Sequence, residues 1–195
     1  MIAGTLALSL TACNKSPGPA PAPPPATDQG QPEFSPSPYK APPPKANPNK
    51  TVTVKSTAFA DGKPIPEQFT CKGDGDPPPL TWSGTAGAKA VAVVVKDTDA
   101  PNGGFVHWIV VDLPGNATAL EIDNLPEGAQ EALNSDGGTG WTPPCPPSGI
   151  HHYHFTVYAL DGPTGVPDSG SIDDAMAGIK GHYTGYGEVV GTVAA

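Results

Sequence analysis

The sequence predicts a mainly β domain with one late helix. The convincing helical segment is residues 171–180, which begins with Ser171 and has Asp173 and Asp174 in its first turn. A serine can cap a helix start, and early carboxylates complement the helix dipole. Three runs rich in β-branched and aromatic residues are the strongest strand candidates. They are residues 90–96, 105–113 and 153–160.

Weaker patterns complete the predicted sheet. Residues 125–147 contain so much Gly, Pro and Asn that we expect a long loop, of a length that is usually functional or disordered. Residues 68–71 are expected to be short and extended. Further strands are expected at residues 51–59, 80–82, 118–122 and 188–193.

Composition divides the chain into three parts. Residues 1–13 carry a short apolar run and end in Leu-Thr-Ala-Cys, which resembles the bacterial lipobox, so we expect a lipoprotein signal peptide and lipidation of Cys13. No Lys or Arg precedes that run, and the alternative is a secreted protein cleaved near Ala12. Residues 14–50 predict a disordered Pro/Ala-rich linker, and residues 51–195 the folded domain. We therefore expect an extracytoplasmic protein, lipid-anchored to the bacterial cell membrane.

The charge balance excludes some partners and recognition modes. The net charge is −9, which argues against nucleic-acid binding because that needs a basic face. The chain contains no arginine, so no bidentate guanidinium clamp can hold a phosphate or carboxylate. Any anion must be bound by backbone N–H groups, histidine, tyrosine or lysine.

An acidic turn joins the first two strong strands. Asp97 and Asp99 end one strand, Pro101 follows, and His107 lies in the next strand. Two carboxylates two residues apart can lie on one side of an extended backbone and share a proton. Alternatively, the aspartates stabilise the turn by accepting hydrogen bonds from nearby backbone N–H groups. His107 is a candidate ligand-binding residue or an ordinary core histidine.

A second polar cluster begins the third strong strand. Alternation places His151 and Tyr153 on one face of that strand and His152 and His154 on the other. A His-x-His pair can bind zinc, but spacing alone is weak evidence, and we predict no metal site. Just before it, residues 140–149 form a Pro- and Gly-rich loop suited to close approach of a ligand.

Taken together, these segments resemble the phosphatidylethanolamine-binding protein family, and its bacterial Raf-kinase-inhibitor-like branch in particular. The resemblance covers about residues 51–193, in order and with compatible spacing. The segments that carry it are Asp97-x-Asp99-Ala-Pro101, Phe105-Val-His107-Trp, and Pro144-Cys-Pro146-Pro-Ser-Gly-x-His151-x-Tyr153, supported by residues 69–71, 78–82, 125–128 and 181–182.

The resemblance implies a β-sandwich with a large central antiparallel sheet and a small anion pocket near one end of it. It implies a phosphate-like or phospholipid head-group ligand, no cofactor, and for some members inhibition of a kinase or protease, here one of the cell envelope. Carried over by motif, the ligand-binding residues are Asp97, Asp99, Pro101, Phe105, His107, Pro144, Pro146, His151 and Tyr153.

One residue departs from the family pattern, and two cysteines lie where a bridge is possible. His152 stands where the family usually has arginine, so any ion pair made by that arginine is lost or becomes pH-dependent. Cys71 and Cys145 lie in loops beside the expected pocket. Outside the cytoplasm they are candidates for a disulfide, and the alternative is two free thiols.

The leading functional hypothesis is a lipid-anchored binding module without catalysis, because no activated nucleophile is recognisable. The rival is a hydrolase in which Asp97, Asp99, His107 and His151 serve as acid/base groups or hold zinc. A third interpretation is a protein-interaction module that recognises a phosphorylated or acidic side chain of an envelope protease or kinase.

Overall fold

The computed structural model describes residues 52–120 and 125–195. The predicted signal peptide, linker and lipidation site at Cys13 lie outside the described residues and stay predictions. The strands are β1 (Thr53–Ser56), β2 (Lys63–Pro64), β3 (Leu80–Ser83), β4 (Ala90–Asp97), β5 (Phe105–Pro114), β6 (Ala119–Leu120), β7 (Gln130–Glu131), β8 (Ile150–Leu160) and β9 (Tyr183–Ala194). The helices are the 3-10 turns η1 (Glu67–Phe69) and η2 (Pro101–Gly103) and the α-helix α1 (Ile172–His182).

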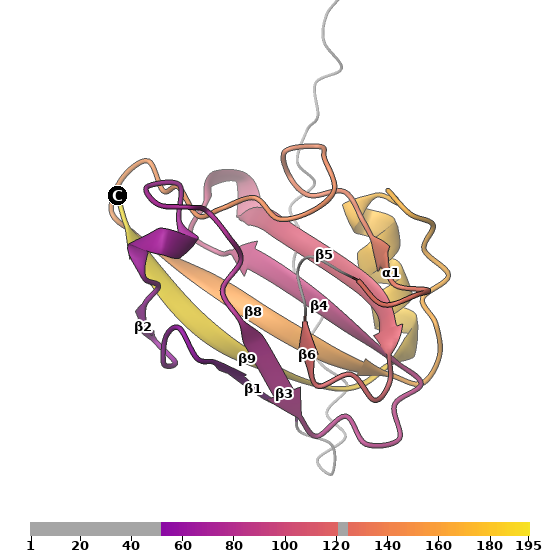
Figure 1. Cartoon of the computed structure of the whole chain (residues 1–195). Helices are drawn as coiled ribbons and strands as arrows, with labels where there is room; N and C mark the ends of the chain where they lie inside the picture. Colours follow the sequence, from indigo (N-terminus) through magenta and orange to yellow (C-terminus); the bar gives the residue numbers. More distant parts are fainter. Residues whose placement is uncertain (1–51, 121–124) are drawn as a thin grey trace, which may run out of the picture. The chain divides into compact units, whose positions relative to one another are not determined.

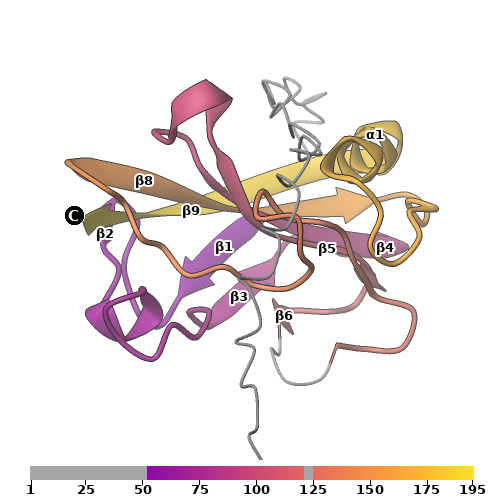
Figure 2. The same ribbon diagram turned by 90° about the horizontal axis from the view of Figure 1, so that it is seen from above.

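The described residues form two sheets and one α-helix. The larger sheet has the order β2-β9-β8-β4-β5-β7, and the smaller has the order β1-β3-β6. Figures 1 and 2 show the small sheet on one face of the large sheet and α1 on the other. The predicted mainly β fold with one C-terminal helix is therefore confirmed. The large sheet is antiparallel except at its edge, where β2 pairs parallel to β9.

β4 is apolar from Ala90 to Val95 because that part of the strand is buried on both faces. Val93 belongs to the core between the two sheets together with Trp82, whereas Val94 belongs to the core beneath α1 together with Ile179. A strand covered on both sides needs a continuous apolar run rather than alternation. Burying one such side chain contributes about 1.5–3 kcal/mol, so β4 holds both layers in place.

The helix begins as the sequence predicts. Ser171 is its N-cap, and its Oγ accepts a hydrogen bond from the Asp174 N–H at 3.1 Å. The Ser171 hydroxyl in turn donates to the Asp174 carboxylate at 2.6 Å. The helix extends to His182, two residues beyond the predicted end, and β9 follows without a loop.

Residues 68–71 are not extended as predicted, because local hydrogen bonds close a turn there. Both the N–H and the hydroxyl of Thr70 donate to the Glu67 carbonyl, at 2.9 and 2.8 Å. Pro66 supplies a φ of −57° just before η1, which favours entry into a helical turn. The turn delivers Cys71 to the edge of the functional site.

β9 is twice as long as the predicted strand at residues 188–193. The prediction left out the residues before 188 because the glycines there are typical of a loop. At Gly187 a Cβ atom would lie 1.8 Å from the Val52 carbonyl oxygen. The glycine therefore lets the chain before β1 cross directly over β9. The Val52 N–H donates to the Tyr186 carbonyl at the same crossing.

Candidate functional site

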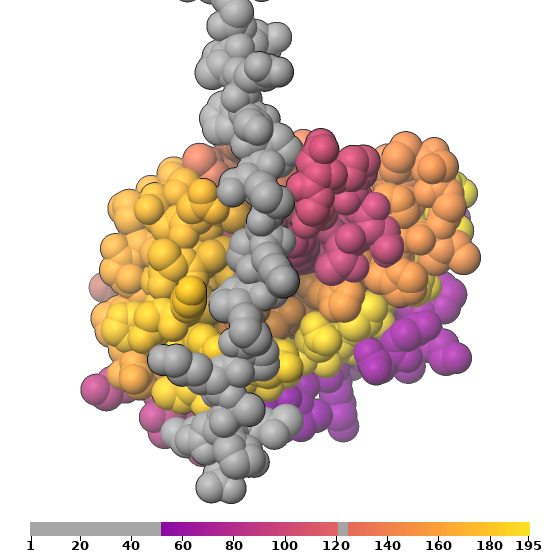
Figure 3. All heavy atoms as spheres, turned by 180° about the vertical axis from the view of Figure 1, so that it is seen from behind, coloured from indigo at the N-terminus to yellow at the C-terminus, as the bar shows by residue number. Residues whose placement is uncertain are grey.

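A pocket of about 330 Å³ lies at one end of the large sheet. The end of β4 and the beginnings of β5 and β8 meet there, because the three strands are antiparallel neighbours. The turn between β4 and β5 (magenta in Figure 3) stands out from the surface beside the beginning of β8 (orange). The residues that line the pocket are Asp97, Ala100, Pro101, Phe105, His107, Asp136, Thr142, Pro143, Cys145, Pro146, Pro147, His151 and Tyr153.

Asp97 is the buried centre of the site and is only 4% exposed. Its Oδ1 accepts hydrogen bonds from the N–H groups of Asp99 and Ala100, at 2.9 and 3.2 Å. Its Oδ2 lies 2.6 Å from Nδ1 of His151, and its charge also acts on the nearby Tyr153 hydroxyl. With three donors around it, the carboxylate is largely occupied by the protein itself, and it orients His151, which faces the pocket.

Asp99 takes a different direction from Asp97. Its carboxylate accepts hydrogen bonds from the backbone N–H and from Nδ1 of His152, each at 2.7 Å, on the exposed side of β8. The hydrogen bond from the His152 side chain lowers the pKa of Asp99. The prediction that the two aspartates share a proton is therefore wrong. The alternative, in which the aspartates accept hydrogen bonds from backbone N–H groups, describes this turn.

His107 is buried in β5 and held in one tautomer. Its Nδ1 lies 2.7 Å from the Thr142 carbonyl oxygen, which can only accept, so Nδ1 carries the proton. Burial lowers the pKa of His107, which keeps the ring neutral near pH 7. In that form Nε2 is an acceptor with no hydrogen-bond partner among the residues described.

Aromatic contacts fix the His107 ring from two sides. Its centroid lies 4.7 Å from that of Phe105 and 5.2 Å from that of Tyr153. Burial, together with the nearby charge of Asp97, raises the pKa of Tyr153, so its hydroxyl stays protonated and can donate. The site thus combines a fixed imidazole, a phenol and the second imidazole of His151, which is only 8% exposed.

Asn134 organises the loop that carries Thr142, and sequence reasoning missed it. Its side-chain amide donates to the Gly140 carbonyl and to the Thr142 hydroxyl, each at 3.1 Å. Its carbonyl oxygen accepts from the N–H groups of Asp136 and Gly138. The Asn-Ser-Asp-Gly-Gly sequence is a turn signal that pointed to this role. The same turn brings the Asp136 carboxylate to the pocket wall.

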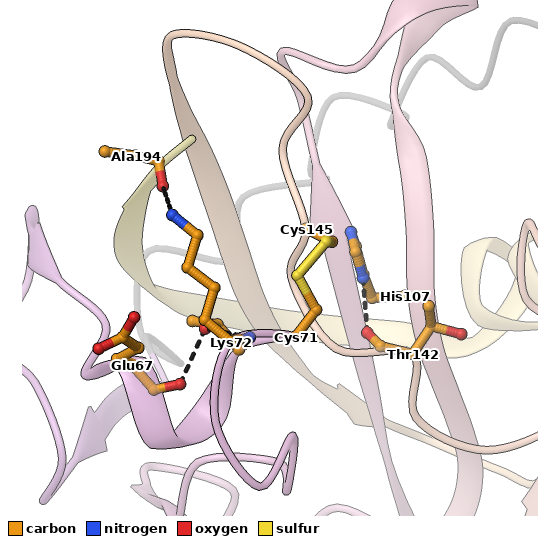
Figure 4. The surroundings of a disulfide bond; sticks show 8 residues. Glu67, Cys71, Lys72, His107, Thr142, Cys145 and Ala194 are labelled. Carbon is orange, nitrogen blue, oxygen red and sulfur yellow. Dashed lines mark hydrogen bonds between the residues drawn. A yellow bond between two sulfur atoms is a disulfide. The ribbon is translucent and has the colours of Figure 1, made fainter.

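Cys71 and Cys145 are joined by a disulfide, with their Cα atoms 5.4 Å apart. Figure 4 shows the bond linking the loop after η1 to the proline-rich loop, beside His107 and Thr142. The Cys71 N–H also donates to the Pro144 carbonyl at 3.0 Å. Cys145 lines the pocket, so the disulfide forms part of its wall.

Most of the predicted ligand-binding residues lie together in this pocket, and two do not. Asp99 pairs with His152 outside the lining, and Pro144 is buried behind it with its carbonyl bonded to Cys71. The predicted residues that line the pocket are Asp97, Pro101, Phe105, His107, Pro146, His151 and Tyr153.

The pocket lining contains no lysine, so histidine is its one basic residue type. Within residues 52–120 and 125–195, no three His, Cys, Asp or Glu side chains are grouped as metal ligands. In the same part of the chain, no helix is both long and apolar enough to cross a bilayer.

Comparison with known proteins places this chain in one family. The model of the phosphatidylethanolamine-binding protein family matches residues 55–194, most of the chain. The chain therefore belongs to the phosphatidylethanolamine-binding protein family, as its motifs indicate.

Several relatives show how the family is represented elsewhere. A UPF0098 protein of Methanothermobacter thermautotrophicus is 36% identical over 146 residues, covering 72% of this chain and 97% of the relative. A Mycobacterium tuberculosis protein named as a candidate lipoprotein, LppC, is 42% identical over 143 residues, covering 72% of this chain and 71% of the relative.

Two solved structures share the fold at appreciable identity. The phosphatidylethanolamine-binding protein homologue CT736 of Chlamydia trachomatis has a TM-score of 0.70 at 33% identity, covering 75% of this chain and 99% of that structure. Escherichia coli YbcL, a member of the same family, has a TM-score of 0.69 at 32% identity, covering 74% and 98%.

Proposed function

We propose that this chain is an extracytoplasmic binding module, tethered to the cell membrane by a lipid on Cys13, whose pocket binds a phosphate-like group. The family match and the relative named as a candidate lipoprotein support the class of protein and its anchoring. The ligand is a phosphoryl compound such as a phospholipid head group.

The arrangement around Asp97 carries this proposal. The carboxylate accepts hydrogen bonds from three internal donors, so it repels an incoming anion less than a free carboxylate would. Among the described residues, Nε2 of His107 and Nε2 of His151 have no hydrogen-bond partner. A phosphoryl oxygen that carries a proton can donate to such a nitrogen, and a protonated imidazole can donate to a charged oxygen. With no lysine in the lining, binding is weak and favours a monoanion.

The test is a calorimetric titration of the full chain with phosphorylethanolamine. His151→Ala removes one of the two imidazoles and should weaken binding about tenfold or more, because a hydrogen bond to a charged group contributes ~1.5–3 kcal/mol. His182→Ala is the matched control, since His182 pairs with Asp161 and does not line the pocket. Equal affinities for all three proteins would contradict the proposal.

We also propose that this binding module regulates a kinase or protease of the cell envelope. The pocket would then receive a phosphorylated or acidic side chain of that enzyme. A pull-down with the wild-type chain, repeated with His151→Ala, measures it. Loss of the same captured enzyme with the variant supports this role, and retention contradicts a role for the pocket.

A hydrolase is the second candidate, and one observation favours it. His151 Nδ1 bonds to Asp97 at 2.6 Å, the arrangement in which a carboxylate orients a catalytic base. A hydrolase should turn over p-nitrophenyl phosphate or p-nitrophenyl acetate at a rate abolished in His151→Ala. If it depends on a metal, a chelator should abolish that rate as well. No turnover above the variant's background would rule out this candidate for these two ester classes.

A further inference from the structure

The disulfide differs from an ordinary structural bridge in two respects. It lies at the surface, since both Cys71 and Cys145 are exposed. It also forms part of the pocket wall, because Cys145 is a lining residue. An exposed disulfide is accessible to an attacking thiolate, whereas a buried one is protected.

The loop that contains Cys145 makes few backbone hydrogen bonds to the rest of the domain. Residues 143–149 include Pro143, Pro144, Pro146 and Pro147, which have no N–H to donate. The backbone hydrogen bonds of this segment to other described residues are Cys71 N–H to the Pro144 carbonyl and Ala195 N–H to the Gly149 carbonyl. The covalent bond is therefore the main restraint at the centre of the segment.

The neighbouring part of the loop is anchored independently of the disulfide. Thr142 N–H donates to the His107 carbonyl at 3.0 Å, and the Trp141 indole N–H donates to the Gly75 carbonyl at 2.9 Å. Loss of the disulfide would therefore free the wall formed by Pro146 and Pro147 while the fold and the His107 position persist.

We propose that the Cys71–Cys145 disulfide is a redox-modification site, and that its reduction by an extracytoplasmic dithiol opens one wall of the pocket. The effect on ligand affinity rests on the proposed function, whereas the reduction and the loosening of the loop do not.

The reduction is a thiol–disulfide exchange that needs no reactant besides the dithiol. One thiolate of the dithiol attacks a sulfur of the bridge, forms a mixed disulfide and releases the other cysteine as a thiolate, which takes up a proton. The second thiol of the reductant then attacks the mixed disulfide and releases the second cysteine. Two electrons pass to the protein, and the reductant leaves as its own disulfide.

The experiment uses the full chain with Cys13→Ser, so that Cys71 and Cys145 are its remaining cysteines, and dithiothreitol as the dithiol. Under native conditions the free thiols should rise from none to two per chain. The ring resonances of His151 should shift or broaden on reduction, because its pocket neighbours Pro146 and Pro147 move, while those of His182 stay in place. Phosphorylethanolamine should bind about tenfold more weakly, since a loosened loop must be ordered again on binding.

A second variant removes the bridge permanently. Cys71→Ser with Cys145→Ser should show the resonances of the reduced chain and no response to dithiothreitol. If that variant does not fold, circular dichroism of the reduced chain that still carries Cys71 and Cys145 is the deciding measurement. Unfolding of that chain on reduction would overturn the inference, because the bridge would then hold the whole domain and not the pocket wall alone.

Two further results would overturn the inference. One is a bridge that dithiothreitol reduces only in denaturant. The other is reduction that leaves the His151 resonances unchanged. If the oxidised chain fails to bind phosphorylethanolamine, the proposed function fails, while the thiol count and the resonances still decide this inference.

Discussion

Asp97 lines the pocket, yet its side chain is engaged mainly by the protein itself. Its two oxygens are occupied by two backbone N–H groups and by Nδ1 of His151. The aspartate was recognisable from the sequence, but its direction was not. Asp97 and Asp99 are two residues apart and end on different histidines because the chain turns between them. The local hydrogen bond from Asp99 N–H, rather than strand alternation, decides which carboxylate is buried.

His107 gives the pocket a pH dependence whose sign follows from burial. We expect the affinity for phosphorylethanolamine to fall as the pH rises from 6.5 to 8.5. A phosphomonoester loses its second proton near pH 6, and burial lowers the pKa of His107 from its usual 6.5. Above pH 7 neither the phosphoryl group nor Nε2 of His107 carries the proton that a hydrogen bond between them needs. Binding therefore takes up one proton, and the Kd rises by at most about tenfold per pH unit.

Calorimetry at three pH values measures this dependence. His107→Gln is the matched variant, because the glutamine amide can hydrogen-bond but does not titrate in this range. Its affinity should be lower at pH 6.5 and should change less with pH. A wild-type affinity that rises with pH would contradict the assigned protonation state.

At the scale of elements, the site depends on strands that bring distant residues to one end of a sheet. The antiparallel pairing of β4 with β8 sets Asp97 opposite Tyr153, although they are far apart in the sequence. β4, β5 and β8 were predictable because each carries a long apolar run. β9 was only partly predictable, because its glycines are required by the chain that crosses it and that crossing is a tertiary feature.

Two glycine-to-alanine substitutions test whether the crossing of β9 requires a glycine, one at Gly187 and one at Gly181 as a control. Gly187→Ala places a Cβ against the Val52 carbonyl and should destabilise the domain by about 3 kcal/mol or more, since backbone cannot move aside easily. Gly181→Ala, in α1, meets no atom within 4 Å and should stabilise the helix by ~0.5–1 kcal/mol. Urea unfolding measures both, and a neutral Gly187→Ala would contradict the crossing.

At the scale of the whole molecule, the fold and most of the pocket lining could be predicted from the sequence. Motifs and apolar periodicity located Asp97, His107, His151 and Tyr153, because such signals are local. The parts that were missed depend on contacts remote in sequence or on loop hydrogen bonds. Asn134 acts through four hydrogen bonds that no periodic pattern reveals.

The disulfide connects these scales, and its effect on stability can be stated. It joins residues 74 positions apart. A crosslink over that separation lowers the entropy of the unfolded chain, which corresponds to at most about 4.5 kcal/mol. Cys71→Ser with Cys145→Ser should lower the urea midpoint accordingly while leaving the folded circular dichroism spectrum in place. An unchanged midpoint would contradict a restraining role for the bridge.

The most direct test of the pocket assignment is a histidine-detected NMR titration of the full chain. Phosphorylethanolamine is added in one series and zinc in another. We expect phosphorylethanolamine to shift the ring resonances of His107 and His151 saturably, while those of His182 do not respond. A response of those two rings to zinc alone, complete near one equivalent, would contradict the phosphoryl-binding pocket and favour a metal-dependent hydrolase.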